Sequence, residues 1–309
     1  MVVPFPLPLV HLSTPAKAVY LVKTMKDPYA TSKSDERLAA EEVVLRRFVS
    51  ERRWERMQHV LDRRSRYISV AVEDIFQPHN GSAVLRSCDA FGVQDVHIIE
   101  NRNRYRVNPG VELGTAQWLS LFRYRAAGDS TADGGAGNNH SGAGRDTPAP
   151  AGADTTTTTT AATTEAVSAL KAAGYRIVAT SPHRENFDLE SLPLTTGPMA
   201  IFFGTEKEGL SETLLAAADE YLRIPMRGFV ESLNISVSAA ICLNKLGDRL
   251  RTEITDWQLA PRDRRIILNR WLHGTVKNAR LILERELGGR EPGHRELADR
   301  AFADRELSI

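Results

Sequence analysis

Short apolar runs alternate with longer amphipathic or alanine-rich stretches through the middle of the chain. Six of these runs have the length and the β-branched or aromatic content of strands, and they cover residues 67–75, 95–100, 117–124, 175–181, 198–204 and 220–226. Strands that alternate with helices are typical of an α/β domain with a parallel sheet. The pattern therefore predicts a parallel sheet flanked by helices over residues 67–253.

A basic helical extension is predicted before this domain, at residues 34–66. Its apolar positions have roughly helical spacing, with a break near Ser50. Residues 45–66 hold eight Lys and Arg side chains against three acids. A solvated helix face and a nucleic-acid contact explain this excess equally well.

A second basic helical extension is predicted after the domain, at residues 254–309. Residues 261–289 read as a long amphipathic helix or a helix pair, and residues 262–285 hold seven basic side chains against two acids. The apolar residues expected to pack on the body are Ile267, Leu268, Trp271, Leu272, Val276, Leu281 and Ile282. The basic side chains then stay available for a partner, and the tail from Gly288 is expected to be loose.

Two segments are predicted to lack fixed structure. Residues 1–33 read as a flexible arm. Residues 127–164 contain no apolar side chain larger than Ala or Pro, so burial cannot offset the entropy lost on ordering. We expect a disordered insertion at 127–164, with no chemistry assigned to it.

The composition excludes some classes of protein but does not indicate a function. The formal net charge of +1 identifies no partner, and the two cysteines, Cys88 and Cys242, lie in separate predicted helices. This argues against a disulfide framework or a cysteine-based zinc site and favours a cytoplasmic setting. No apolar run is long enough to span a bilayer. The proline-broken N-terminus is a poor signal peptide, whereas an organelle transit peptide stays open because residues 1–25 lack acids.

The segment GTEKEGLS, residues 204–211, follows a predicted strand and is superficially similar to a phosphate-binding loop. Leu210 stands where that loop needs a lysine, and no G-x-G-x-x-G occurs in the chain. Nucleoside triphosphate hydrolysis and a standard dinucleotide site therefore lack support.

Two further polar segments have a structural and a functional interpretation. In PHNGSAVLR, Asn80 stands at a predicted helix start and Arg86 on the second turn of that helix. In IPMRGFVESLN, Ser232 and Asn234 precede another predicted helix. Taken alone, the Asn and Ser residues are explained as helix caps and Arg86 as a surface residue.

Taken together and in order, three segments closely resemble the three motifs of the SPOUT superfamily of knotted methyltransferases, and within it the TrmH type. They are PHNGSAVLRSCDAFGV, FFGTEKEGLS and IPMRGFVESLNISVSAA. The resemblance covers roughly residues 50–126 and 165–285. It implies a tRNA (guanosine(18)-2′-O)-methyltransferase that acts on the D-loop of tRNA. It also implies a deep C-terminal trefoil knot, a rare exception to unknotted connections, and a homodimer with the active site at the interface.

The resemblance also assigns the site residues. S-adenosyl-L-methionine is expected to lie in the knot, held by Gly204, Thr205, Glu206, Gly209, Ile224, Pro225, Met226, Gly228, Ser232, Leu233 and Asn234. The motif residues expected to serve catalysis are Asn80, Arg86, Glu206, Ser232 and Asn234. The two basic extensions are expected to bind tRNA phosphates through Arg52, Arg53, Arg56, Arg264, Arg265 and Lys277. No metal is expected.

A guanidinium normally stays protonated, which makes Arg86 an awkward general base. Our hypothesis is that Arg86 engages an RNA phosphate and stabilises the oxyanion that develops at the ribose 2′-oxygen. Two alternatives stay open. One is the same chemistry on ribosomal RNA, although relatives of that kind often carry a separate N-terminal domain. The other is a non-catalytic RNA-binding protein on the same scaffold.

Overall fold

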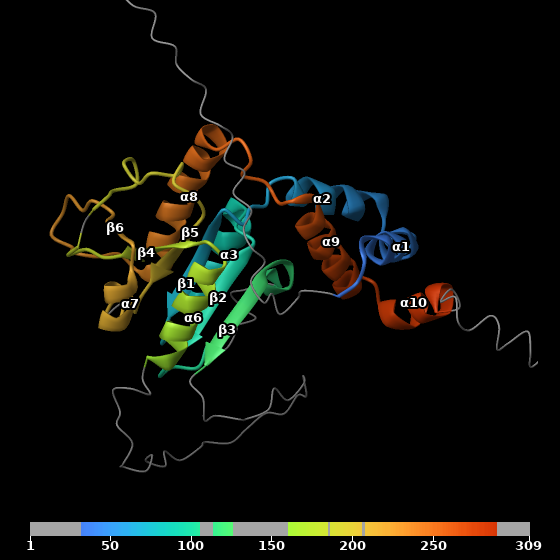
Figure 1. Cartoon of the computed structure of the whole chain (residues 1–309), viewed down its shortest axis with the longest axis horizontal. Coiled ribbons are helices and arrows are strands. Elements are labelled where there is room, and N and C mark those ends of the chain that lie inside the picture. Colours follow the sequence, from blue (N-terminus) through green and yellow to red (C-terminus); the bar gives the residue numbers. More distant parts are fainter. Residues whose placement is uncertain (1–31, 106–113, 126–159, 185, 206–207, 289–309) are drawn as a thin grey trace, which may run out of the picture.

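A six-stranded parallel sheet forms the centre of the molecule (Figure 1). The computed structural model describes residues 32–105, 114–125, 160–184, 186–205 and 208–288. The strands are β1 (Ile68–Glu73), β2 (Asp95–Glu100), β3 (Ser120–Arg125), β4 (Arg176–Thr180), β5 (Met199–Phe203) and β6 (Glu220–Leu222). They lie in the order β3-β2-β1-β5-β4-β6, and every pairing is parallel. The parallel sheet expected from the alternating pattern is confirmed.

Every strand except β2 is shorter than predicted, and β3 and β6 show what replaces the missing residues. Residues Thr115–Trp118 form a 3₁₀ turn, η1, so β3 begins only at Ser120. β6 ends at Leu222, and residues 223–234 continue as irregular chain to the next helix.

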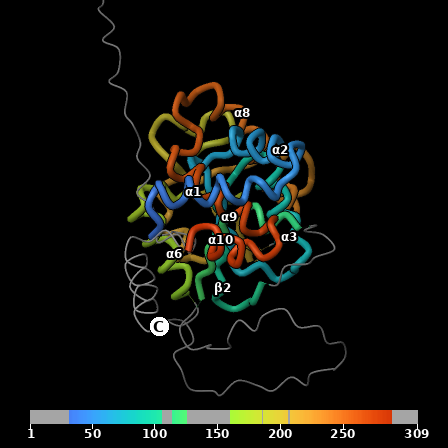
Figure 2. The backbone as a smooth tube through the Cα atoms, turned by 90° about the vertical axis from the view of Figure 1, so that its right-hand side faces the viewer, coloured from blue at the N-terminus to red at the C-terminus, as the bar shows by residue number. Residues whose placement is uncertain are grey.

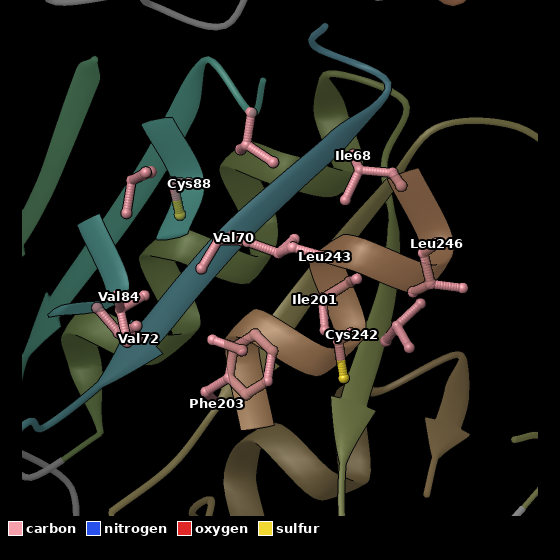
Figure 3. Close-up of a cluster of buried hydrophobic side chains, with 14 of the residues drawn as sticks. Ile68, Val70, Val72, Val84, Cys88, Ile201, Phe203, Cys242, Leu243 and Leu246 are labelled. Carbon is pink, nitrogen blue, oxygen red and sulfur yellow. The ribbon is translucent and has the colours of Figure 1, made fainter. Parts of the chain in front are cut away.

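Helices cover both faces of the sheet. Val70, Val72, Ile201 and Phe203 point to the face covered by α3 (Pro78–Phe91) and α8 (Ile235–Glu253), as Figure 3 shows. The alternate residues of the same strands, such as Ala71 and Phe202, pack under α6 (Ala161–Ala172) and α7 (Glu212–Ala217). Because successive side chains of a strand point to opposite faces of the sheet, each of these strands contributes to two apolar cores.

The start of α6 corrects the expected insertion at 127–164. Residues 161–164 are helical, and the side chains of Ala162 and Thr163 are fully buried. Small side chains such as that of Ala162 can pack closely on the sheet, so the absence of large apolar residues did not exclude a helix there. Residues 126–159 lie outside the described part of the chain.

Four helices from the two ends of the chain pack together beside the sheet (Figures 1 and 2). They are α1 (Asp35–Arg46), α2 (Glu51–Leu61), α9 (Pro261–Thr275) and α10 (Ala279–Leu287). Ser34 and Ser50 are the N-caps of α1 and α2, so the predicted break near Ser50 is confirmed. The two extensions share one apolar cluster, which includes Leu45, Met57 and Trp271.

The basic C-terminal segment is a helix pair. α9 ends at Thr275, and Asn278 adopts a left-handed conformation with φ of 58° immediately before α10. Asn tolerates this conformation better than most residues. One expected apolar anchor is wrong: Leu281 is 63% exposed. Among the described helices, none combines the length and apolar character that a membrane crossing requires.

Candidate active site

A cavity of about 560 Å³ opens at the carboxyl ends of β4, β5 and β6. Its walls include Phe203, Leu210, Leu215, Leu222, Ile224, Met226 and Leu233, with Thr180, Ser181, His183, Thr205 and Ser232 among the polar residues. Ligands of open parallel sheets bind beyond the carboxyl ends of the strands. The cavity therefore lies where the fold most readily holds a small molecule.

A tight glycine loop forms one wall of the cavity. The backbone N–H groups of Thr205 and Gly209 each donate to the other's carbonyl oxygen across 3.0 Å. A Cβ on Gly204 would lie 2.1 Å from the carbonyl carbon of Gly209, and Gly209 itself has φ of 71°. Any side chain at position 204 would force the loop open, so this part of the motif is set by backbone geometry.

A buried carboxylate anchors the end of this loop. Glu73, at the end of β1, accepts hydrogen bonds from the Ser211 backbone N–H at 2.8 Å and from the Ser211 hydroxyl at 2.7 Å. The Thr163 hydroxyl donates to the same carboxylate at 2.5 Å. Glu73 is only 2% exposed. It thereby ties the glycine loop to β1 and α6, a role that the sequence analysis missed.

A second tie joins the loop after β2 to the glycine loop. Arg102 donates to Glu208 at 2.5 Å, and this hydrogen bond raises the pKa of Arg102. The backbone N–H groups of Asn101 and Arg102 each donate to Asp74 at 2.8 Å. Asp74 has φ of 51°, a strained value for a residue with a side chain.

The first and third motifs meet at two asparagines. The Asn234 side-chain N–H donates to Asn80 Oδ1 across 3.2 Å. Asn234 is also the N-cap of α8, because its Oδ1 accepts from the backbone N–H of Ser236 at 2.8 Å. Asn80 is not a helix cap: α3 begins at Pro78 after Gln77, and Asn80 is buried inside its first turn. The capping interpretation is correct for Asn234 and wrong for Asn80.

Arg86 lies apart from the cavity. It is an exposed residue of α3, six positions after Asn80 and thus about 9 Å along the helix axis. The cavity wall does not include it. Arg86 therefore does not contribute to the cavity of its own chain.

Most of the predicted cofactor residues do surround the cavity. Its lining includes Gly204, Thr205, Gly209, Ile224, Met226, Ser232 and Leu233. Pro225, Gly228 and Asn234 are in the same loop but do not line it. Glu206 lies outside the described residues.

The loop after β4 belongs to the cavity although its sequence did not predict this. Thr180, Ser181, His183 and Arg184 also line the cavity. Arg184 donates to the Tyr221 hydroxyl at 3.3 Å, which raises the pKa of Arg184, and to Glu212 at 3.2 Å. The missed signal was topological: if β4 is parallel to β5 and next to it, the loop after β4 must reach the same edge.

The residues present fit S-adenosyl-L-methionine. The apolar side chains of Leu210, Leu222 and Ile224 can enclose a purine. The carboxylate of Glu231 on the cavity wall suits a ligand with cationic sulfonium and ammonium groups, whereas Glu208 and Glu212 are paired with Arg102 and Arg184.

The predicted RNA-binding arginines differ in their surroundings. Arg52, Arg53 and Arg56 are exposed on α2. Arg264 is engaged within the chain, since it donates to Gln58 at 2.8 Å and to Asp62 at 2.7 Å. Arg265 lies 4.0 Å from Asp35, and Lys277 is exposed.

Comparisons with known proteins give the family. The profile of the SpoU rRNA methylase family matches residues 148–244, a range that contains the second and third motifs. The chain is 36% identical over 239 residues to the tRNA (guanosine(18)-2′-O)-methyltransferase of Borreliella burgdorferi, covering 77% of this chain and 93% of that protein. The Thermus thermophilus enzyme of the same name is 32% identical over 194 residues, which cover 63% of this chain and 81% of the enzyme.

A solved structure has a similar fold. The TrmH/SpoU tRNA modifying enzyme of A. aeolicus matches with a TM-score of 0.54 and 24% identity, covering 74% of this chain and 98% of that one. The match extends over nearly the whole of the solved chain, so the fold resemblance is not confined to one motif. The chain therefore belongs to the SpoU methylase family, in its TrmH branch.

Proposed function

We propose that this protein transfers the methyl group of S-adenosyl-L-methionine to the ribose 2′-hydroxyl of guanosine 18 in tRNA. The observation that carries this proposal is the junction of Asn80 with Asn234 beside a cavity that fits the cofactor. Relatives that match along almost their whole length, such as the Borreliella enzyme, carry this activity in their names.

The chain's own residues divide the work of the reaction. The bound cofactor supplies an electrophilic methyl group on a sulfonium. Gly204, Thr205 and Ser232 hold and orient it, and Leu222 and Ile224 keep water from its apolar parts. Alignment of the two reactants could supply up to about 7–11 kcal/mol in favourable cases.

Arg86 acts on the acceptor. Its guanidinium stays protonated at neutral pH, so the proton of the 2′-hydroxyl passes to solvent water while Arg86 stabilises the negative charge that forms on the oxygen. We assign supporting catalytic roles to Asn80, Glu206, Ser232 and Asn234. The assignment of these roles rests on the motif positions and on the Asn80–Asn234 hydrogen bond.

A homodimer completes the site in this proposal. Arg86 does not line the cavity of its own chain, so a second copy is needed to bring an arginine and a cavity together. Phe76 is 73% exposed and Phe229 108% exposed, and both belong to loops that lead to the joined asparagines. Apolar side chains of this size favour burial against a partner.

We also infer a knotted course for the motif loops.

A complementation experiment tests the shared site. Arg86→Ala and Gly204→Leu each inactivate a homodimer, whereas a mixed dimer keeps one intact site. Equal mixtures should therefore regain about a quarter of the wild-type activity, because half of the dimers are mixed. No regained activity after subunit exchange, with mixed dimers demonstrated by mass, would contradict a site shared between subunits.

Labelled cofactor and a tRNA transcript test the activity directly. Label should appear in the ribose of guanosine 18 and be absent when a 2′-deoxyguanosine replaces that nucleotide. Labelling of ribosomal RNA instead would favour the ribosomal alternative. Cofactor and RNA binding without labelling of any RNA would favour a non-catalytic protein.

The names of the similar proteins favour tRNA over ribosomal RNA, because the Borreliella and Thermus relatives are both named for guanosine 18 of tRNA. We infer a cytoplasmic location, where both buried thiols, Cys88 and Cys242, stay reduced. Cell fractionation with an antibody against the chain checks this location.

A further inference from the structure

A second and larger cleft lies between the terminal helices and the sheet domain. Its volume is about 910 Å³, within the range of small-molecule sites. The residues that line it come from α2 and the positions on either side of it, from the C-terminal part of α3, and from η1 and α9: Ser50, Arg52, Arg53, Glu55, Arg56, Met57, His59, Val60, Arg64, Asp89, Trp118 and Trp271. None of the residues that line the cofactor cavity is shared with it.

One face of α2 forms a wall of this cleft. Arg53, Arg56, Met57 and Val60 recur at spacings of three and four, so they lie on one side of the helix. The two arginines are exposed, whereas Met57 is buried and Val60 is half-buried. The wall is therefore cationic at the surface and apolar toward the interior.

Two tryptophans form the aromatic part of the cleft. The rings of Trp118 and Trp271 meet edge to face, with centroids 5.4 Å apart. The Trp271 indole N–H donates to the Trp118 carbonyl oxygen at 3.1 Å. Trp271 is 2% exposed, whereas Trp118 is half-buried. The packing holds Trp118 in place while leaving part of it open to a ligand.

A buried donor at the cleft has no partner within the described residues. The side chain of Arg64 is fully buried; its Nη1 donates to the Val93 carbonyl oxygen at 2.8 Å, and its Nη2 pairs with Asp89. Its Nε has no hydrogen-bond partner in the described part of the chain. A buried N–H without a hydrogen bond is costly, but this atom is itself covered, and the Arg64 guanidinium lies over the Trp271 ring, 5.8 Å from its centroid. Arg64 therefore supports the aromatic wall of the cleft rather than contacting a ligand.

We propose that this cleft binds an unpaired nucleotide of the RNA substrate, with its base against Trp118 and its phosphate beside Arg53 and Arg56. Duplex RNA hides its base faces, whereas an unpaired base can stack on an aromatic ring. The cleft offers an aromatic ring for a base in Trp118 and cations for a phosphate in Arg53 and Arg56. The proposal rests on the proposed function only for the identity of the RNA as tRNA.

Competition binding with two RNA probes of equal phosphate number tests the proposal. A labelled tRNA transcript is displaced by an unpaired oligonucleotide or by a duplex. The wild-type chain should bind the unpaired RNA more tightly. Trp118→Leu should lower that affinity by about fivefold or more and remove the preference, whereas Trp118→Phe should keep it. Arg53→Ala should weaken both RNAs.

Control variants separate base binding from a general effect. Two variants outside the cleft should leave the preference unchanged. They are Trp257→Phe and Lys171→Ala, the second of which removes a cation of α6 that pairs with Asp219. Circular dichroism establishes that each variant is folded. Equal binding of the two RNAs by the wild type, or an unchanged preference in folded Trp118→Leu, would overturn the proposal. Methyl transfer to tRNA is scored separately, so loss of the proposed function and loss of the cleft proposal give different results.

Discussion

Asn234 donates its side-chain N–H to Asn80 Oδ1 although 154 positions separate the two residues in the chain. The same Asn234 side chain caps α8 by accepting from Ser236. Asn234 therefore both caps α8 and contacts the first motif, the two roles that its sequence position left open. The capping bond stabilises the helix start, and the second bond sets the position of α8 against α3.

Replacement of Asn234 by Ser should separate the two roles. Serine retains a capping oxygen, so the free energy of unfolding should fall by less than about 1 kcal/mol. The shorter side chain loses the bond to Asn80, and methyl transfer should fall at least tenfold. Chemical unfolding and single-turnover methylation measure the two effects. Asn234→Ala is the matched comparison, since it loses both bonds; equal activity of Asn234→Ser and wild type would remove the bridge from the mechanism.

Arg86 should contribute to turnover rather than to cofactor binding. Arg86→Ala should lower kcat by about 10²–10³, the usual cost of losing one oxyanion-stabilising donor. Its Kd for S-adenosyl-L-methionine, measured by calorimetry, should not change, because Arg86 is proposed to act on the ribose of the acceptor rather than on the cofactor. Arg86→Lys keeps the charge and loses the planar fork. Near-normal turnover in the lysine variant would rule out a bidentate role, and near-normal turnover in the alanine variant would rule out any catalytic role.

The sheet was predictable because strand burial has a local signature. β2, with all its residues buried, matches the predicted run 95–100 at both ends. The run 220–226 shows where that signature fails. Ile224 and Met226 are apolar because they line the cavity, and apolar composition alone does not distinguish a cavity wall from a strand.

The loops around the cavity were predictable, but the residues that support them were not. The three motifs indicated two of the loops that line the cavity without any structure. Glu73 gave no such signal, because it resembles any polar residue at the end of a strand, and its partners Thr163 and Ser211 lie far from it in the chain. The packing of α1 on α9 was equally hidden, since an apolar helix face does not specify its partner.

Glu73 should position the glycine loop for the cofactor. Glu73→Gln keeps the size of the side chain and removes the charge that three hydrogen bonds now satisfy. Hydrogen bonds to charged groups contribute about 1.5–3 kcal/mol each. We expect lower thermal stability and about tenfold weaker cofactor binding, measured by calorimetry. Glu190→Gln, which removes an exposed carboxylate paired with Lys245, is the control; unchanged cofactor affinity in Glu73→Gln would contradict a positioning role.

The arginines of α2 should bind RNA more strongly than Arg264. Replacing Arg52, Arg53 and Arg56 together by Ala should weaken tRNA binding and make its salt dependence less steep, by about 0.9 in the log–log slope for each lost duplex phosphate contact. Arg264→Ala should have a smaller effect, because Asp62 already pairs with that guanidinium. Filter binding at several salt concentrations measures both variants. A larger loss for Arg264→Ala would place the RNA on α9 instead of α2.

Acid should destabilise the terminal helices through Glu41. The Glu41 carboxylate is buried between α1 and α9 and contacts Lys33, Asn269 and His273. Burial by itself raises the pKa, but the hydrogen bonds from these three residues outweigh it and lower the pKa of Glu41 from 4.5 to about 2. The depressed pKa means that folding favours the charged form.

The stabilisation from Glu41 is therefore complete above about pH 4.5 and is lost as the pH falls toward 2. It amounts to at most about 3 kcal/mol. Denaturant unfolding at pH 6 and pH 3 should show a larger loss for the wild type than for Glu41→Gln, which cannot titrate. Other carboxylates contribute equally to both proteins, so only the difference between the two losses reports on Glu41. Identical losses would mean that Glu41 has the same pKa in the folded and unfolded chains.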